Sequence, residues 1–415
     1  MKKFLASVLA LAMTLSLAAC GGGAGSNPGG TSGSQANDGG TSGGGAQSGA
    51  VTIKVGGVGP LTGGAAIYGN AAKGGAEIAA EEINALGGIQ IDLRYEDDAH
   101  DAEKSVNAYN TLKDWGMQVF LGSVTSTPGA ATAAESDADH IFYLTPSASS
   151  TDVIGGVVNP LTGSIDVPRH SNVFQMCFVD PNQGSASAQY IKENNLGSAI
   201  AVIYKNDDVY STGIYNSFKS AADQLGLKIV STTTFTEDSK TDFSVQLGDA
   251  KNNGADLIYL PTYYEPNALI LTQANAMGYN PKYFGVDGMD GILSVDGFDK
   301  ALAEGVMLLT PFNADSEDAA TQSFVSKYQE KYGGTPNQFA ADAYDCVYAI
   351  YEALKDEDIT SDISASDLCD ILIAKFPTMT FSGLTGENMT WSADGAVSKN
   401  PRGMYIEGGV YVGMD

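Results

Sequence analysis

The chain has 415 residues, 43% of them hydrophobic and 17% charged, which is typical of a globular protein long enough for two domains. Its formal net charge is −27, and it has only 22 lysine and arginine residues. Nucleic acids and anionic lipid surfaces are bound through Lys and Arg, so the composition disfavours both as partners. The acidic excess is explained by solubility.

The N-terminus is predicted to be a targeting segment. Lys2 and Lys3 precede an apolar stretch, residues 4–17, that is too short to span a bilayer comfortably. The segment ends in Leu17-Ala18-Ala19-Cys20 and resembles a bacterial lipobox, where a signal peptidase cuts before the cysteine and lipid is attached to its sulfur. We expect a signal peptide over 1–19 and a lipid anchor at Cys20; the alternative is an ordinary secretory signal with an incidental cysteine. Residues 20–50, rich in Gly, Ser and Thr, predict a flexible linker.

The folded part begins with a predicted strand, residues 51–58, a glycine-rich turn and a helix that ends at Gly87-Gly88. The turn nearly matches a dinucleotide fingerprint, but its third glycine is displaced to Gly63, so no nucleotide cofactor is expected. The next strand, residues 91–95, ends in acidic residues at 96–98, and a helix is expected over 102–115. These acids could collect calcium together with Asp101, but a solvated acidic loop is favoured because no glycine-spaced calcium loop surrounds them.

Two neighbouring strands of the first half are followed by small hydroxylated residues. A buried strand over 117–121 leads into Gly122–Thr127, and a helix is expected to start near Pro128. Free backbone N–H groups and the positive end of a helix dipole meet there, which suits a small anion such as a carboxylate. The alternative is that Ser126 or Thr127 only caps its own helix. The second strand, residues 141–145, leads into Pro146–Ser150.

After a long loop, residues 155–171, the alternation of strands and helices starts afresh. Strands are expected at 173–179, 199–204, 228–235, 257–261, 283–286 and 306–309, and a final hairpin is expected to turn at Gly408-Gly409. Helices are expected between the strands of 199–286 and over 318–332, 337–355 and 366–376. Alternation of this kind predicts an α/β fold with doubly wound parallel sheets in two lobes.

The cysteines and histidines suggest neither a metal site nor a catalytic triad. Cys346 and Cys369 lie on consecutive predicted helices, and whether they pair is open; Cys177 lies in an apolar run and is expected to be a buried free thiol. The three histidines are scattered along the sequence. No nucleophile elbow lies outside the linker and no phosphate loop is present, so we expect neither an enzyme nor a cofactor.

Side chains from both halves are expected to face a cleft between the lobes. The first half contributes Ser126, Thr127, Ser147, Ser149 and, after the first turn, Tyr68; the second contributes Tyr210, Tyr263 and Asp287, each just past a strand. Hydroxyl and N–H groups on one wall suit a carboxylate, whereas a lone acid on the other wall suits an ammonium group. A zwitterion that bridges the two walls would hold the lobes closed.

Several short segments, in this order and spacing, resemble the substrate-binding lipoprotein of a branched-chain amino acid (Leu/Ile/Val) ABC transporter, of the type I periplasmic-binding fold. The resemblance covers nearly all of residues 51–415. It is carried by Pro60-Leu61-Thr62-Gly63, Tyr68-Gly69, Glu82-Ile83-Asn84, Tyr95-Glu96-Asp97-Asp98, Thr145-Pro146-Ser147-Ala148-Ser149, Asp180-Pro181-Asn182-Gln183-Gly184 and Ala343-Tyr344-Asp345.

The resemblance implies two lobes joined by a hinge, one formed by 51–179 and 308–382 and the other by 180–307 and 383–415. It also implies roles for the cleft residues. Ser126 and Thr127 would hold the carboxylate of an amino acid, the Ser147-Ala148-Ser149 segment and Asp287 would hold its ammonium group, and aromatics would line the side-chain pocket: Tyr68, Tyr210, Tyr263 and Phe339. A membrane permease is the implied partner, and a monomer is expected.

Departures from the family leave the ligand open. Asp287 stands where the familiar members carry glutamate, their first-lobe disulfide has no counterpart, and the 155–171 loop is longer than usual. An amide, a urea-like compound or another small carboxylate is the alternative ligand, and a signalling protein is the alternative partner. Residue types cannot rank leucine, isoleucine and valine, because one methylene changes affinity by only about 1–3 kcal/mol.

Overall fold

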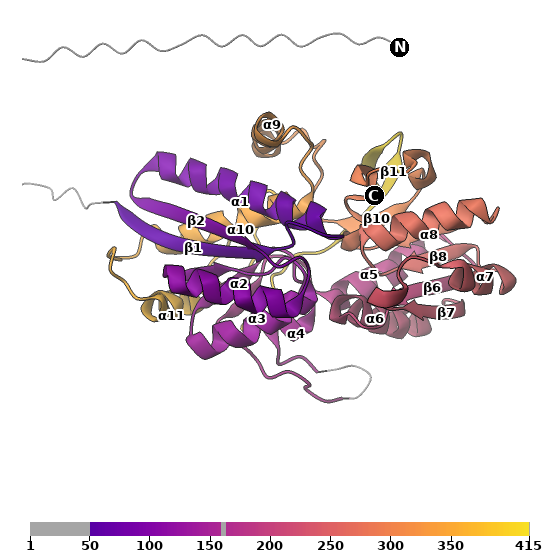
Figure 1. Ribbon diagram of the computed structural model, residues 1–415, viewed down its shortest axis with the longest axis horizontal. Coiled ribbons are helices and arrows are strands. Elements are labelled where there is room, and N and C mark those ends of the chain that lie inside the picture. Colours follow the sequence, from indigo (N-terminus) through magenta and orange to yellow (C-terminus); the bar gives the residue numbers. More distant parts are fainter. Residues whose placement is uncertain (1–49, 159–162, 415) are drawn as a thin grey trace, which may run out of the picture. The chain divides into compact units, whose positions relative to one another are not determined.

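The computed structural model describes residues 50–158 and 163–414 (Figure 1). The predicted signal peptide, the lipidation site at Cys20 and the linker up to residue 49 lie outside the described residues, as does 159–162 in the long loop. No helix in the described ranges combines the length and the apolar character needed to cross a bilayer.

The first sheet has five parallel strands in the order β2-β1-β3-β4-β5. Strands and helices alternate along the chain, which is the doubly wound arrangement that the sequence predicts. The strands are β1 (Val51–Gly59), β2 (Ile89–Asp97), β3 (Val119–Leu121), β4 (Phe142–Thr145) and β5 (Val173–Gln175); the helices between them are α1 (Ala66–Leu86), α2 (Ala102–Trp115), α3 (Ser126–Asp139) and α4 (Thr151–Ile154).

Three later helices complete this lobe: α9 (Ala319–Tyr332), α10 (Gln338–Leu354) and α11 (Ala365–Lys375). Helices α1 and α10 lie side by side (Figure 1). Gly75 makes this approach possible, because a Cβ atom there would stand 1.8 Å from the carbonyl oxygen of Ala340. Helix α9 joins α1 through ion pairs, including Lys327–Glu82 at 2.6 Å.

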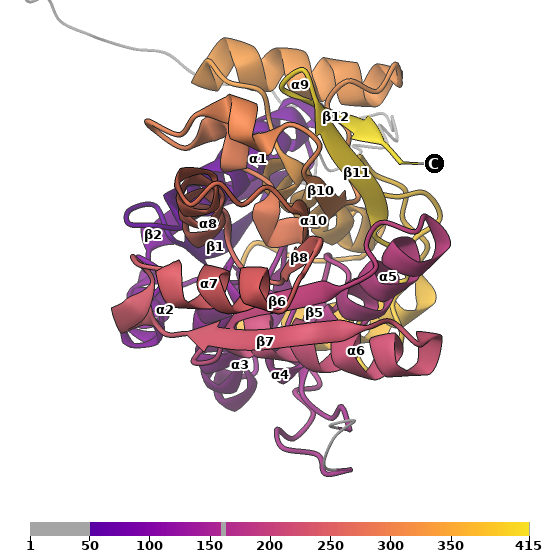
Figure 2. The ribbon, with the colours of Figure 1, turned by 90° about the vertical axis from the view of Figure 1, so that its right-hand side faces the viewer.

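The second sheet has seven strands in the order β12-β11-β10-β9-β8-β6-β7. The strands from β6 to β10 run parallel, and β11 and β12 form the predicted antiparallel hairpin (Figure 2). The strands are β6 (Ile200–Lys205), β7 (Ile229–Phe235), β8 (Leu257–Leu260), β9 (Lys282–Gly285), β10 (Met307–Thr310), β11 (Arg402–Glu407) and β12 (Val410–Gly413); the helices are α5 (Asp180–Glu193), α6 (Val209–Leu225), α7 (Ser244–Asn252) and α8 (Tyr264–Ala276).

The predicted α/β fold with two lobes is confirmed by the two separate sheets. The chain passes between the lobes after β5, after β10 and before β11. The boundaries between the lobes stay a prediction. Strand β10 hydrogen-bonds within the second sheet up to Thr310, whereas the first lobe was predicted to resume at residue 308. Trp391, predicted to belong to the second lobe, donates to the carbonyl of Gln175 in the first lobe.

Two expectations about single residues have clear outcomes. Cys177 is a buried free thiol as predicted, and Cys346 and Cys369 are also free, so the alternative in which they pair is not realised.

The expected solvated acidic loop is wrong for Asp98, which is 0% exposed and accepts a hydrogen bond from the backbone N–H of His100. Burial raises the pKa of Asp98 to about 7, and the hydrogen bond from His100 and the charge of Lys104 only partly offset this effect. Its neighbour Asp97 instead holds the glycine-rich turn, accepting from the N–H of Leu61 at 2.8 Å.

Candidate functional site

The first wall of the site is the N-terminus of α3. The apolar strand β3 ends at Leu121, and Gly122 follows where a Cβ atom would stand 1.4 Å from the ring of Tyr143, so only glycine fits. The helix then starts at Ser126, which is buried and accepts a hydrogen bond from the N–H of Ser150 at 3.1 Å. The first backbone N–H groups of α3 therefore meet the carboxyl edge of the sheet, as the sequence predicts.

The second hydroxylated segment is held from below by Thr145. Its hydroxyl accepts from the N–H groups of Ser147 and Ala148, at 3.2 and 2.9 Å, and donates to the carbonyl of Ser123 at 2.8 Å. This turn brings Ser147 to the surface of the site. Ser149 is fully buried behind it, where its carbonyl accepts from the N–H of Asp180 at 3.0 Å.

The opposite wall comes from the second lobe and centres on Asp287. Its carboxylate accepts from the hydroxyl of Tyr210 at 2.5 Å and from the N–H of Gly288 at 2.8 Å. The rings of Tyr210 and Tyr263 are stacked with their centroids 4.8 Å apart. The carboxylate is thus held rigidly by neutral donors.

Asp287 is 4% exposed. Burial raises its pKa to about 6, and the hydrogen bond from Tyr210 only partly offsets this effect. A cation beside the carboxylate would recover the electrostatic energy that burial costs. This is the behaviour expected of a site for an ammonium group.

Aromatic side chains close the site from the side of α1 and α10. The ring of Tyr68 lies 4.3 Å from that of Phe339 and 5.8 Å from that of Tyr263, centroid to centroid. Its hydroxyl also donates to the carbonyl of Gly288 at 2.5 Å and accepts from the N–H of Tyr264 at 3.1 Å. Tyr68 is therefore a contact between the two lobes as well as part of the wall.

The walls enclose a small cavity that both lobes share. It is lined by Tyr68, Val124, Thr125, Ser126, Ser147, Tyr210, Tyr263, Asp287, Gly288 and Phe339. Its volume is about 10 Å³, counted as space for the centre of a water-sized sphere, which is room for about one water molecule. The lobes are closed in this arrangement, and a ligand larger than a water molecule can enter only when they separate.

Three of the ten predicted binding residues lie outside this cavity. Thr127 donates its hydroxyl to Asp208 of the second lobe at 2.9 Å and so joins the lobes directly. Ala148 and Ser149 are buried behind Ser147. The other seven predicted residues line the cavity together.

The cavity also has lining residues that were not predicted as ligand contacts: Val124, Thr125 and Gly288. Thr125 and Gly288 are adjacent in sequence to a predicted residue and Val124 lies two positions before Ser126. Their side chains gave no chemical reason to select them. Thr125 is held by the ring of His100, whose Nδ1 lies 2.9 Å from the threonine hydroxyl.

Comparison with known proteins decides the family. The family model described as "Periplasmic binding protein" matches residues 52–409. The chain belongs to this family. A binding protein agrees with a cavity that both lobes share and that a carboxylate and hydroxyl groups line.

Among curated relatives of this periplasmic binding protein, the Leu/Ile/Val-binding protein homolog 3 of Brucella melitensis is 28% identical over 240 residues. That match spans 57% of this chain and 61% of the relative.

Solved structures show the same fold. The branched-chain amino acid transporter substrate binding protein LivJ from Streptococcus pneumoniae, in complex with isoleucine, has a TM-score of 0.74 and 27% identity and covers 87% of this chain and 97% of its own. A solute binding protein from R. palustris in complex with benzoate has a TM-score of 0.75 but only 19% identity, and covers 88% of this chain and 95% of its own.

Proposed function

We propose that this chain is the extracytoplasmic receptor of an ABC transporter, which captures a small aliphatic amino acid between its lobes and delivers it to a membrane permease. The observation that carries the proposal is the pairing of two features across one cavity. A helix N-terminus with Ser126 forms one wall, and the buried carboxylate of Asp287 forms the other. A zwitterion matches both features at once, and neither wall alone would distinguish it from a simple anion or cation.

Each part of an amino acid has a matching surface. The α-carboxylate would accept hydrogen bonds from Ser126 and the first N–H groups of α3, and the ammonium group would donate to Asp287 and to the Ser147 segment. The side chain would lie among Tyr68, Tyr263 and Phe339, and the ring of Tyr68 contacts the other two. This aromatic lining supports an apolar side chain.

Binding would work by shifting the equilibrium between open and closed lobes. A ligand that touches both walls is bound fully only by the closed form, so closure is favoured by the difference between its affinities for the two forms. The closed form is already supported by direct contacts between the lobes, including Tyr68 with Gly288 and Thr127 with Asp208. These contacts support closure without a ligand. Because the cavity then has room for about one water molecule, the closed form that holds an amino acid must be wider than this one.

The N-terminal sequence supports a tether to the outer face of the cell membrane. A signal peptide over 1–19, a lipid on Cys20 and a flexible linker to residue 50 would keep the receptor near its permease. Two or more acyl chains make a stable anchor, whereas one does not. Labelling of the expressed protein with a radioactive fatty acid, and loss of the label in Cys20→Ala, would test this part.

The first experiment is calorimetric titration of the protein, unfolded and refolded to remove bound ligand, with leucine, isoleucine, valine and other amino acids. We expect saturable binding of aliphatic amino acids. In Asp287→Ala, affinity should fall by about 2–5 kcal/mol, or about 30-fold to several thousand-fold, because the ammonium group loses its partner. Unchanged affinity in this variant would remove Asp287 from the site.

The aromatic lining also fits a second class of ligand, a small carboxylate without an ammonium group. The benzoate complex of a structural neighbour keeps this alternative open. Titration with benzoate and 4-methylpentanoate, the amine-free analogue of leucine, separates the two. Binding of these compounds alone would favour the alternative and would leave Asp287 without a role.

A further inference from the structure

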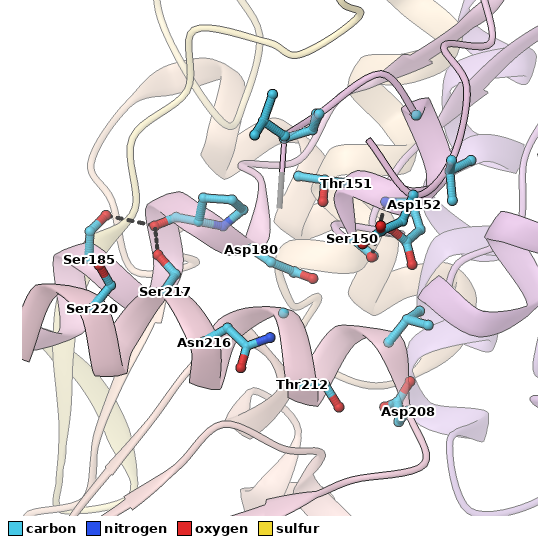
Figure 3. A pocket seen from close by; sticks show the side chains of 18 of the residues that line it. Ser150, Thr151, Asp152, Asp180, Ser185, Asp208, Thr212, Asn216, Ser217 and Ser220 are labelled. Carbon is cyan, nitrogen blue, oxygen red and sulfur yellow. Dashed lines mark hydrogen bonds between the residues drawn. The ribbon is translucent and has the colours of Figure 1, made fainter. Parts of the chain in front are cut away.

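A second and much larger cavity lies between α4 of the first lobe and α5 and α6 of the second (Figure 3). Its volume is about 660 Å³ on the measure used for the amino acid cavity. It has none of that cavity's lining residues. It is therefore a separate candidate site, independent of the proposed function.

The lining of this cavity carries charge of one sign. It includes Asp152, Asp166, Asp180, Asp207 and Asp208, and no lysine, arginine or histidine. Asp207 is neutralised from outside by Lys205, 3.2 Å away. Two of the other carboxylates, those of Asp180 and Asp208, are buried. Keeping a buried carboxylate ionised costs free energy unless a cation lies close to it.

Asp180, at the start of α5, is the strongest of these groups. It is 1% exposed, and neither carboxylate oxygen has a hydrogen-bond partner, although the hydroxyl of Ser149 lies near enough to lower its pKa. The net effect of burial, and then of the charges of Asp287, Asp208 and Asp152, is to raise the pKa of Asp180 well above its ordinary value. Figure 3 shows its carboxylate directed into the space between α4 and α6.

The surroundings of Asp180 keep that space open. On α6, Gly213 faces the carboxylate, and a Cβ atom there would stand 2.9 Å from its Oδ2. One turn earlier, Asp208 is 3% exposed, and its Oδ2 has no hydrogen-bond partner, while its Oδ1 accepts from Thr127. Two buried carboxylates thus line one cavity, and both oxygens of Asp180 are without a hydrogen bond.

The spacing of the carboxylates does not suit a metal ion. No group of three or more Asp, Glu, His or Cys side chains in the described residues is close enough to hold a metal ion. Separate carboxylates in a long cavity instead suit a ligand with ammonium groups at intervals. The walls between them are apolar at Val157, Val209 and Ala221, which suits methylene chains.

From this combination we propose that the cavity between α4, α5 and α6 binds an aliphatic di- or polyamine, with one ammonium group against Asp180 and another toward Asp208 or Asp152. Hydroxyl and amide groups on α6, among them Thr212 and Asn216, provide further acceptors along the cavity. Because the site is built from both lobes, a bound polyamine also favours the closed form.

The test is calorimetric titration of the whole protein with spermidine and with cadaverine, using 1,5-pentanediol and Mg²⁺ as probes that lack either the charge or the chain. We expect one molecule of spermidine per protein and no comparable heat from the diol or from Mg²⁺. In Asp180→Asn the affinity for spermidine should fall at least about tenfold. This variant should fold, because it removes an unpaired buried carboxyl group.

The matched control is Glu330→Gln, which removes one charge from the exposed face of α9. It should leave spermidine binding unchanged at the same ionic strength. An equal loss of spermidine affinity in the two variants would mean that spermidine binds the acidic surface without preference for this cavity, and the proposal would be wrong. It would also be wrong if Asp180→Asn weakened leucine binding and left spermidine binding intact, since Asp180 would then belong to the amino acid site. Failure of the amino acid panel, by contrast, would leave this proposal standing.

Discussion

Asp287 shows how a single buried carboxylate can favour binding at the expense of stability. It is held by neutral donors, Tyr210 and Gly288, and burial raises its pKa to about 6 from an ordinary value of 3.8. The fold therefore prefers its protonated form. A ligand ammonium group reverses that preference, so the pH dependence of binding and the pH dependence of stability should run in opposite directions.

Leucine affinity should fall as the pH is lowered through about 6, because a proton then competes with the ammonium group for Asp287. Between pH 7 and pH 5 the expected loss is about tenfold. Titration calorimetry at several pH values measures it. The isosteric variant Asp287→Asn should bind weakly at every pH, with no step near 6. A wild-type affinity that stays level down to pH 5 would contradict an ionised Asp287 as the ammonium partner.

Without ligand, the same residue should lower stability at neutral pH. A raised pKa means that the contribution of Asp287 is most favourable below its ordinary pKa of 3.8 and is lost as the pH rises through about 6. Asp287→Asn should therefore increase the free energy of unfolding at pH 7.5 by about 1–3 kcal/mol. Urea unfolding of the ligand-free protein measures this. The gain should shrink at pH 4, and a gain that is independent of pH would point to packing instead.

At the scale of elements, α10 is tied to the segment that leads into β11 by a buried network. Lys399 donates to Asp342 at 2.6 Å and to the hydroxyl of Thr385, and the two charged side chains are 3% and 2% exposed. Asp345, one turn along α10, accepts from the N–H groups of Leu384 and Thr385. Burial raises the pKa of Asp342 to about 6 despite the neighbouring ammonium group. The network fixes the path of the chain just before it returns to the second lobe.

Breaking this ion pair on one side should be much worse than replacing both partners. Lys399→Met should cost about 3–5 kcal/mol of unfolding free energy, because the buried carboxyl group of Asp342 loses its ion-pair partner. The double variant Lys399→Met/Asp342→Leu should recover a large part of that loss. Urea unfolding gives both values.

Lys327→Met is the matched control, since it breaks the half-exposed pair with Glu82 and should cost no more than about 1 kcal/mol. If the double variant is as unstable as the single one, the charge left behind is not the cause.

For the whole molecule, closure and ligand entry exclude each other. The shared cavity has room for about one water molecule, so an amino acid can enter only after the lobes separate. Direct contacts that hold the lobes together, such as the hydrogen bond from Thr127 to Asp208, must then break on opening. The balance of these contacts against the ligand's own contacts sets the affinity.

A covalent link between the lobes should block binding. In the variant Thr127→Cys/Asp208→Cys, oxidation should trap the closed form and abolish leucine binding, and reduction should restore it. Gel mobility and thiol counting show whether the link has formed, and calorimetry before and after reductant measures binding. The three native cysteines in the described part of the chain are buried, so they should react slowly. Full binding by the oxidised variant would show that entry does not need the lobes to part.

Local sequence by itself determined the elements and most of the site. Helix α2 has its predicted bounds because Asp101 caps the N–H of Lys104 and Gly116 ends it in a left-handed conformation, both local effects. The predicted fold class and six of the seven predicted residues that line the cavity followed from strand ends that meet at one edge of a sheet. The seventh, Phe339, followed from the family resemblance.

Only the tertiary structure decided what depends on contact between segments far apart in the sequence. Thr127 bonds Asp208 in place of lining the cavity, Asp98 is buried although it lies in an acidic run, and the carboxylate of Asp180 has no hydrogen-bond partner although the residue begins a helix. Their residue types are those of ordinary caps and turns. What distinguishes these side chains is that they lose contact with water or approach the other lobe. The residues next to them in the sequence indicate neither.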